Sequence, residues 1–296
     1  MLGASCTCPE PLTLRYDAPA EYFEEALPIG NGRIGAMVYG GPVTDRISLN
    51  DITLWTGEPD KGEEHPDFYL SETMTPWGEA ASWFEKVREA LDNEDYREAD
   101  RLQRHVQGHY SENYQPLGSL EITYPEGEIT EYRRLLDISD AHAEVTYKKD
   151  GKLFKAEYIA SAPDSVIVIR LSSEAPIEAS ITLDSQLPHQ TSASGNMLIS
   201  DGYAAWHSYP NYYYNFKERF LYDPDRGIHY RTVVSCEGAV AQEGKLVISG
   251  VREATIRIVN STSFAGFDRD PVKEGKEYKE AAIKNMALAM DKDWKA

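Results

Sequence analysis

The chain has 296 residues and a net charge of −19, because 49 acidic residues outnumber 30 lysines and arginines. This charge argues against a nucleic-acid partner, whose phosphates would be repelled, and it is compatible with a neutral ligand such as an oligosaccharide. The hydrophobic fraction of 41% supports a real core, yet no apolar run reaches the length of a membrane span. The three cysteines, Cys6, Cys8 and Cys236, are not spaced as a disulfide framework.

Residues 1–11 are expected to form a disordered leader, and an alternating strand is expected at residues 12–16. Residues 28–32 are typical of a turn, and residues 33–39 read as the strand that follows it. The run 30–35 also fits the dinucleotide fingerprint G-x-G-x-x-G. That site requires a helix after the glycines, so that phosphate meets the helix N-terminus. Because a strand follows instead, we interpret the run as a hairpin turn.

A helical insertion is expected at about residues 77–109, between the β segments. Apolar residues recur there at helical spacing, namely Ala80, Phe84, Val87 and Leu91. Residues 93–95 are expected to divide the insertion into two helices, with Asp92 or Asn93 capping the second one.

The remainder of the chain up to residue 266 shows a β pattern. Strands are predicted at residues 120–124, 143–147, 153–159, 165–171, 177–183, 197–200, 227–236, 245–249 and 254–260. No helix lies between them to provide a parallel crossover, so the pattern favours antiparallel sheets. We predict an all-β fold over residues 12–266, a two-sheet antiparallel β-supersandwich. A helix should follow, with Tyr278, Ala282, Met286 and Ala289 near one face.

Four collinear segments carry a family resemblance. They are residues 26–57, residues 114–120 (YQPLGSL), residues 132–137 through 161–164, and residues 210–212 through 262–264. They resemble the N-terminal domain of the inverting α-L-fucosidases of glycoside hydrolase family 95. The resemblance covers nearly the whole chain.

The resemblance implies a catalytic helical barrel further along the same polypeptide, acting without a metal cofactor on terminal fucosyl linkages of oligosaccharides. Residues 267–296 would then begin a helical linker toward that barrel. None of the barrel's catalytic motifs occurs here, so no catalytic residue, metal ligand or cofactor site is assigned to this chain. A periplasmic or extracellular location is implied by the resemblance alone. An α-L-galactosidase of the same family is an alternative, because the residues that choose the sugar are not in this chain.

The loop at Tyr114 and Gln115 is the candidate for substrate binding, because an amide both donates to and accepts from sugar hydroxyls. A turn fixed by Pro116 and Gly118 is the competing interpretation. His105 and His109 stand four residues apart, which on a helix would suit a metal, but Gly108 weakens the helix there. A polar helix end is the preferred interpretation of that pair.

Residues 206–222 are dense in aromatic side chains. We predict that Trp206, Tyr212 and Tyr213 form an interface with the barrel or part of the core, since aromatic residues dominate both settings. Stacking against sugars is the competing role for this segment. The chain could accordingly be a free-standing carbohydrate-binding module, or a purely structural one.

Overall fold

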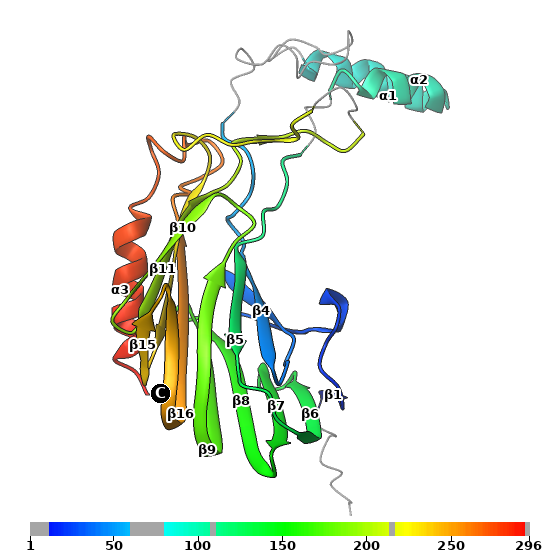
Figure 1. Ribbon diagram of the computed structural model, residues 1–296. Helices are drawn as coiled ribbons and strands as arrows, with labels where there is room; N and C mark the ends of the chain where they lie inside the picture. The colour runs from blue at the N-terminus through cyan, green and yellow to red at the C-terminus, as the bar shows by residue number, and fades with distance from the viewer. Residues whose placement is uncertain (1–11, 60–79, 107–110, 213–216, 294–296) are drawn as a thin grey trace, which may run out of the picture.

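Two long strands, β9 (Val166–Asp184) and β16 (Lys245–Thr262), form the spine of the computed structural model (Figure 1). The structure describes residues 12–59, 80–106, 111–212 and 217–293; the expected leader at 1–11 lies outside this part. The two strands pair antiparallel from Ile258–Ile167 to Leu246–Ile181. Sequence analysis divided each of them into two strands, which was wrong. The pairing register of β16 shifts between Ser249 and Glu253, which is typical of a β-bulge. The two strands stay paired on both sides of this shift.

The first sheet has the order β1-β6-β7-β8-β9-β16-β14-β11-β10. Its other strands are β1 (Thr13–Tyr16), β6 (Ile129–Asp137), β7 (His142–Lys149), β8 (Lys152–Ser161), β10 (His189–Ser194), β11 (Met197–Tyr203) and β14 (His229–Cys236). The second sheet joins β2 (Leu27–Gly30), β3 (Ile34–Val38), β4 (Thr44–Asp51) and β5 (Gly118–Thr123) to β9, and β15 (Ala239–Gln242) to β16.

The two sheets diverge from the shared spine. Strand β8 pairs with residues 166–173 of β9, whereas β5 pairs with residues 180–184 further along the same strand. Every named strand pair in the described residues is antiparallel. The predicted all-β, two-sheet antiparallel sandwich is therefore confirmed, with the addition that β9 and β16 belong to both sheets.

The core lies between the sheets because alternate residues of each strand point inward. Ile34, Ala36 and Val38 of β3 are buried in this way, as are Leu120 and Ile122 of β5. The opposite face of the second sheet carries shorter and more polar side chains, such as Ser48 and Ser119, and stays accessible.

The run 30–35 forms a hairpin, as predicted, and not a phosphate-binding loop. The Asn31 side-chain oxygen accepts hydrogen bonds from the backbone N–H groups of Arg33 and Ile34, at 3.0 and 2.9 Å. Strand β3 follows directly, which leaves no helix to receive a phosphate. The expected turn at 28–32 is corrected at its start, because residues 28–30 belong to β2 and pair with β3.

A carboxylic acid is buried beneath the turn that joins β3 to β4. Asp45 is 2% exposed, and its oxygens accept hydrogen bonds from the Gly40 N–H at 2.7 Å and from the Tyr158 hydroxyl at 2.5 Å. Desolvation raises the pKa of Asp45 to about 6, although these hydrogen bonds and the charge of Arg134 act in the opposite direction. The folded chain is therefore more stable when Asp45 is protonated than when it is ionised.

The helical insertion contains η3 (Ala80–Trp83), α1 (Phe84–Asp92) and α2 (Tyr96–Gln103), which project beyond one end of the sandwich in Figure 1. Asp95, and not Asp92 or Asn93, caps α2, since its side chain accepts from the Glu98 N–H at 3.0 Å. The buried face agrees with the prediction only in part. Val87 packs against the buried residues Ala90, Ala99 and Leu102, whereas Phe84 and Leu91 are exposed.

Helix α3 (Tyr278–Met290) packs on the outer face of the first sheet (Figure 1). Ala282, Met286 and Ala289 are buried against Val233 of β14 and Val259 of β16. These are three of the four residues that were predicted to share one face of this helix. The fourth, Tyr278, is partly buried. None of the helices within the described residues is both long and apolar enough to cross a membrane.

Candidate functional site

Three segments distant in sequence meet at one end of the sandwich, and we call their described residues together the rim: residues 52–58, residues 111–117, and residues 203–212 with 217–226. The backbone joins the first two through Thr56 N–H to Asn113 O at 2.8 Å and Gln115 N–H to Leu54 O at 3.0 Å. Gly57 N–H donates to Ala205 O at 3.2 Å, which attaches the third segment. The loop at Tyr114 and Gln115 and the described part of the aromatic segment are therefore neighbours.

The carboxylate of Glu112 holds the three rim segments together. One oxygen lies 2.7 Å from His207 Nδ1, and the other accepts from the Ser208 N–H at 3.2 Å and from the hydroxyls of Thr56 and Ser208. The Asn113 amide also donates to Ser208 Oγ, at 2.5 Å. Both His207 and Ser208 are buried, and both oxygens of Glu112 accept hydrogen bonds, so the cluster is a structural clamp between the three segments.

Tyr114 and Trp55 form an exposed aromatic pair on the rim. They face each other across an isolated bridge, with ring centroids 6.5 Å apart in an edge-to-face arrangement. Tyr114 is 45% exposed and Trp55 is 43% exposed, and partial burial raises the pKa of the Tyr114 hydroxyl. The Trp55 indole N–H is bound to Ile52 O at 3.0 Å, which fixes the ring. The pair thus offers fixed ring surface to a ligand or partner.

Gln115, predicted to contact substrate together with Tyr114, lies in the layer behind it. Its side chain is 4% exposed, and its amide oxygen is 3.5 Å from the Tyr222 hydroxyl. Its amide nitrogen is 3.5 Å from the carbonyl oxygen of Tyr114. So buried a side chain offers almost no surface for direct contact with a sugar.

The aromatic segment folds as a short hairpin, in which β12 (His207–Ser208) pairs with β13 (Phe220–Leu221). The Arg226 guanidinium lies 3.7 Å from the centroid of the partly buried Trp206 ring and is itself paired with Glu58. Tyr212, by contrast, is 58% exposed. Tyr213 lies outside the described residues. Trp206 therefore anchors the hairpin, and Tyr212 is available to a partner.

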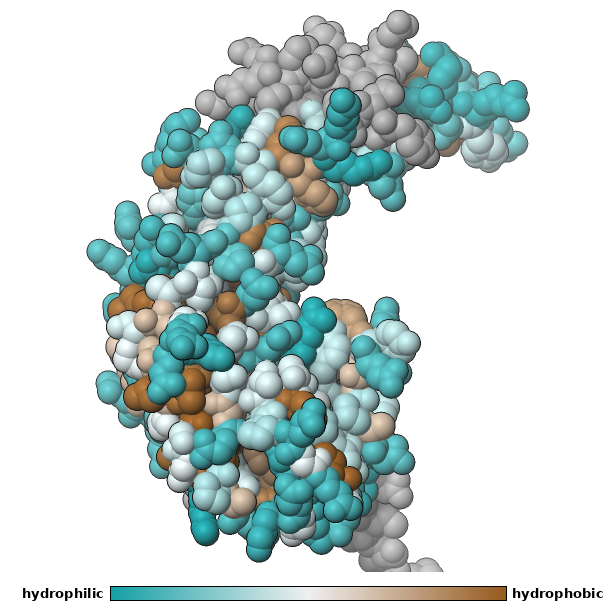
Figure 2. Space-filling view, in the orientation of Figure 1, coloured by the Kyte–Doolittle hydropathy of each residue, from teal (hydrophilic) through white to brown (hydrophobic). Residues whose placement is uncertain are grey.

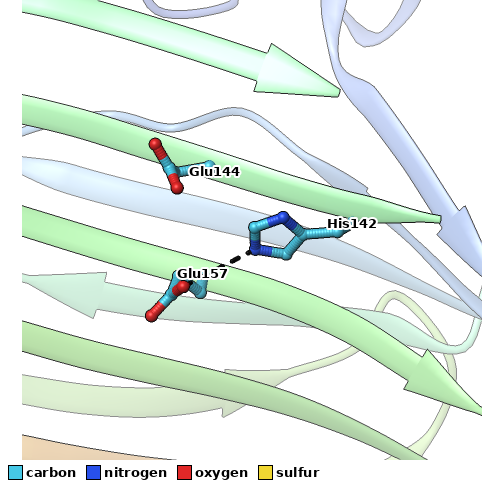
Figure 3. A group of neighbouring side chains, drawn as sticks. All are labelled: His142, Glu144 and Glu157. Carbon is cyan, nitrogen blue, oxygen red and sulfur yellow. Dashed lines mark ion pairs between the residues drawn. The ribbon is translucent and has the colours of Figure 1, made fainter. Parts of the chain in front are cut away.

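A second polar cluster, on the outer face of the first sheet, has the composition of a metal site (Figure 3). Ligand atoms of His142, Glu144 and Glu157 lie within 4.8 Å of one another. The Lys155 ammonium, however, binds both carboxylates at 2.8 Å and so supplies the cation itself. The cluster is an ion-pair network between β7 and β8.

Helix α2 ends at Gln103, so His105 lies beyond its last turn. His105 stacks on Trp83 with ring centroids 3.7 Å apart, and His109 lies outside the described residues. Residues 260–262 (NST) fit the sequence motif for N-glycosylation, but Asn260 is 2% exposed and its side-chain amide donates a hydrogen bond to Asp51 at 2.8 Å.

Comparison with known families gives a match over residues 14–266 to the sequence model described as glycosyl hydrolase family 65, N-terminal domain. The chain belongs to this family. The match spans both sheets and the rim and ends before α3.

Curated relatives agree with the expected resemblance. The chain is 28% identical over 275 residues to "Alpha-L-fucosidase 2" of Arabidopsis thaliana, covering 86% of this chain and 31% of that protein. It is 31% identical over 176 residues to "Probable alpha-fucosidase A" of Aspergillus niger, covering 58% of this chain and 21% of that protein. The chain thus spans about a third or less of these relatives. The expectation of an N-terminal glycoside hydrolase domain similar to α-L-fucosidases is confirmed.

Among solved structures, a putative kojibiose phosphorylase from human microbiome superposes with a TM-score of 0.52 at 8% identity. The superposition covers 96% of this chain and 36% of that one. At such low identity the likeness concerns the fold alone, and it supports the sandwich architecture.

The residues that assemble the rim carry no signal in the sequence. Glu112 and His207 are 95 residues apart, and no local pattern marks either of them as a partner of the other. Tyr114 was predicted as a site residue, but only the isolated bridge between residues 55 and 114 shows that it pairs with Trp55.

Proposed function

We propose that this chain is the N-terminal, non-catalytic β-sandwich domain of a glycoside hydrolase that removes terminal α-L-fucosyl units from oligosaccharides with inversion. The observation that carries the proposal is the match to α-fucosidase relatives over most of this chain and less than a third of their length. The engagement of Glu112 in the clamp supports a structural role. A catalytic helical barrel elsewhere in the same polypeptide would perform the chemistry.

The rim is the surface that we propose to face that barrel. Tyr212 and Tyr213 would contact it, with Trp206 fixed behind them by Arg226. Tyr114 would border the sugar pocket, and Gln115 would hold the loop in place from the buried layer. Residues 267–296 would lead toward the barrel, with α3 docked on the first sheet as the start of that connection.

The test compares the 296-residue chain with the full-length polypeptide that contains it. Both are assayed for release of L-fucose from 2′-fucosyllactose, and for release of L-galactose from the matching L-galactoside. We expect no release by the chain alone and fucose release by the full-length polypeptide. Fucose release by the chain that disappears in a Glu112→Gln variant would refute the non-catalytic role. A preference for the L-galactoside would favour the α-L-galactosidase alternative.

The rim is tested in the full-length polypeptide with Tyr114→Ala. Loss of one aromatic contact to the sugar should raise KM by about tenfold, which corresponds to ~1.4 kcal/mol. Phe267→Ala is the control, because this ring is 89% exposed and lies outside the rim. Equal KM values for the two variants would show that Tyr114 does not contact the sugar. The family assignment does not depend on this result.

A further inference from the structure

The outer face of the second sheet is hollowed into a trough of about 1560 Å³, lined by β3, β4, β5 and β9 (Figure 2). Sites for a drug-sized molecule occupy roughly 300–1,000 Å³, so this trough has room for an extended ligand. Its depth comes from short side chains. Gly35 stands opposite Asn50, and Ser48, Ser119 and Asp184 follow one another in register across three strands.

The floor of the trough carries charges of both signs beside apolar groups such as Met37. Arg46 and Glu121 are neighbours across β4 and β5, and Asp184 lies 3.2 Å from His189. Such a floor offers donors and acceptors at short spacing together with apolar area.

Exposed aromatic side chains enter the trough from opposite ends of the β3–β4 pair. Tyr22 and Phe23, which are 64% and 55% exposed, belong to the segment that Ala20 N–H ties to Tyr39 O, just beyond β3. Trp55 and Tyr114 reach it from the rim, at the other end. Aromatic faces pack well against the apolar C–H faces of sugar rings.

We propose that this trough binds a neutral oligosaccharide chain of several linked sugars. Hydroxyl groups would pair with Glu121 and Asp184, while sugar rings would stack on Trp55 and on the Tyr22–Phe23 pair. A protein partner on the same face would have to desolvate Arg46, Glu121 and Asp184 and satisfy each of them, which is costly. An anionic ligand is disfavoured because the chain carries a net charge of −19. The inference does not require the proposed hydrolase activity.

The test is isothermal titration calorimetry of the 296-residue chain with cellohexaose, xylohexaose, mannohexaose and 2′-fucosyllactose at millimolar concentrations. At least one should bind saturably. Ser119→Trp, which fills the floor, and Trp55→Ala should each weaken that binding at least tenfold. Trp55→Phe should restore most of it, since the stacking face returns without a change of backbone. Phe267→Ala should bind as the unchanged chain does.

Circular dichroism and the thermal midpoint establish that each variant is folded before it is titrated. No saturation with any of the four sugars would overturn the inference. So would unchanged binding in Ser119→Trp, or binding lost in Tyr212→Ala but kept in Ser119→Trp, which would place the sugar on the aromatic hairpin. Self-association of the chain that Ser119→Trp abolishes would assign the trough to a second copy instead. No hydrolysis is measured, so these outcomes are separate from those of the fucose-release assay.

Discussion

Replacing Asp45 with asparagine tests whether a buried carboxylic acid makes the stability of this sandwich depend on pH. The pKa of Asp45 is raised from its usual 3.8 to about 6, mainly by desolvation. The asparagine keeps an oxygen for the Gly40 N–H and nearly the same volume, but it carries no charge at any pH. The substitution therefore removes the ionisation and leaves the packing in place.

The sign and size of the effect follow from the two pKa values. Because the folded chain holds this proton more tightly than the unfolded chain does, the contribution of Asp45 to stability is greatest below pH 4. It is lost as the pH rises from about 4 to about 6, and it changes no further above that. A difference of roughly two pKa units corresponds to about 3 kcal/mol of unfolding free energy.

Urea unfolding followed by circular dichroism, at half-unit pH steps between 4 and 7, measures this difference. Other carboxylates titrate alike in both proteins, so the free energy of the variant minus that of the unchanged chain isolates Asp45. We expect this difference to grow by about 3 kcal/mol across the range. Tyr158→Phe should extend the window to higher pH, because it removes a hydrogen bond that favours the carboxylate. A difference that stays constant from pH 4 to 7 would refute the reasoning.

Three further substitutions test other parts of the structure by urea or thermal unfolding. Glu112→Gln should lower the unfolding free energy by about 1–3 kcal/mol, because the clamp loses its charged acceptor. An unchanged unfolding midpoint would show that the clamp does not stabilise the fold. Met286→Ala should cost about 2–5 kcal/mol through the cavity beneath α3, whereas Leu288→Ala, at an exposed position, should cost less than about 0.5. Gly40→Ala should cost more than about 2 kcal/mol, because φ is +73° and the new Cβ would lie 2.8–2.9 Å from three side chains. Gly151→Ala has nearly the same φ but open space around it, so an equal loss there would show that crowding at residue 40 is unimportant.

Local sequence patterns predicted the structure correctly where residues close in sequence determine the conformation. The strands at residues 143–147 and 153–159 were predicted, and between them Asp150 and Gly151 adopt the positive φ values, 50° and 74°, that a tight hairpin turn needs. The buried face of α3 followed from its helical spacing. The buried face of α1 did not, because Phe84 and Leu91 share a face that meets no core within the described residues.

The sequence by itself determined the antiparallel sandwich and most of its strands, since alternation and turn chemistry act over a few residues. Only the tertiary structure decided that β9 and β16 run unbroken through both sheets, because a bulge is recognised by the strand that pairs across it. It also decided that Gln115 is buried while Tyr114 is exposed, and that the Glu112 carboxylate is the hydrogen-bond partner of His207. Burial and hydrogen bonding between distant segments depend on the whole packed chain, and no short stretch of sequence specifies them.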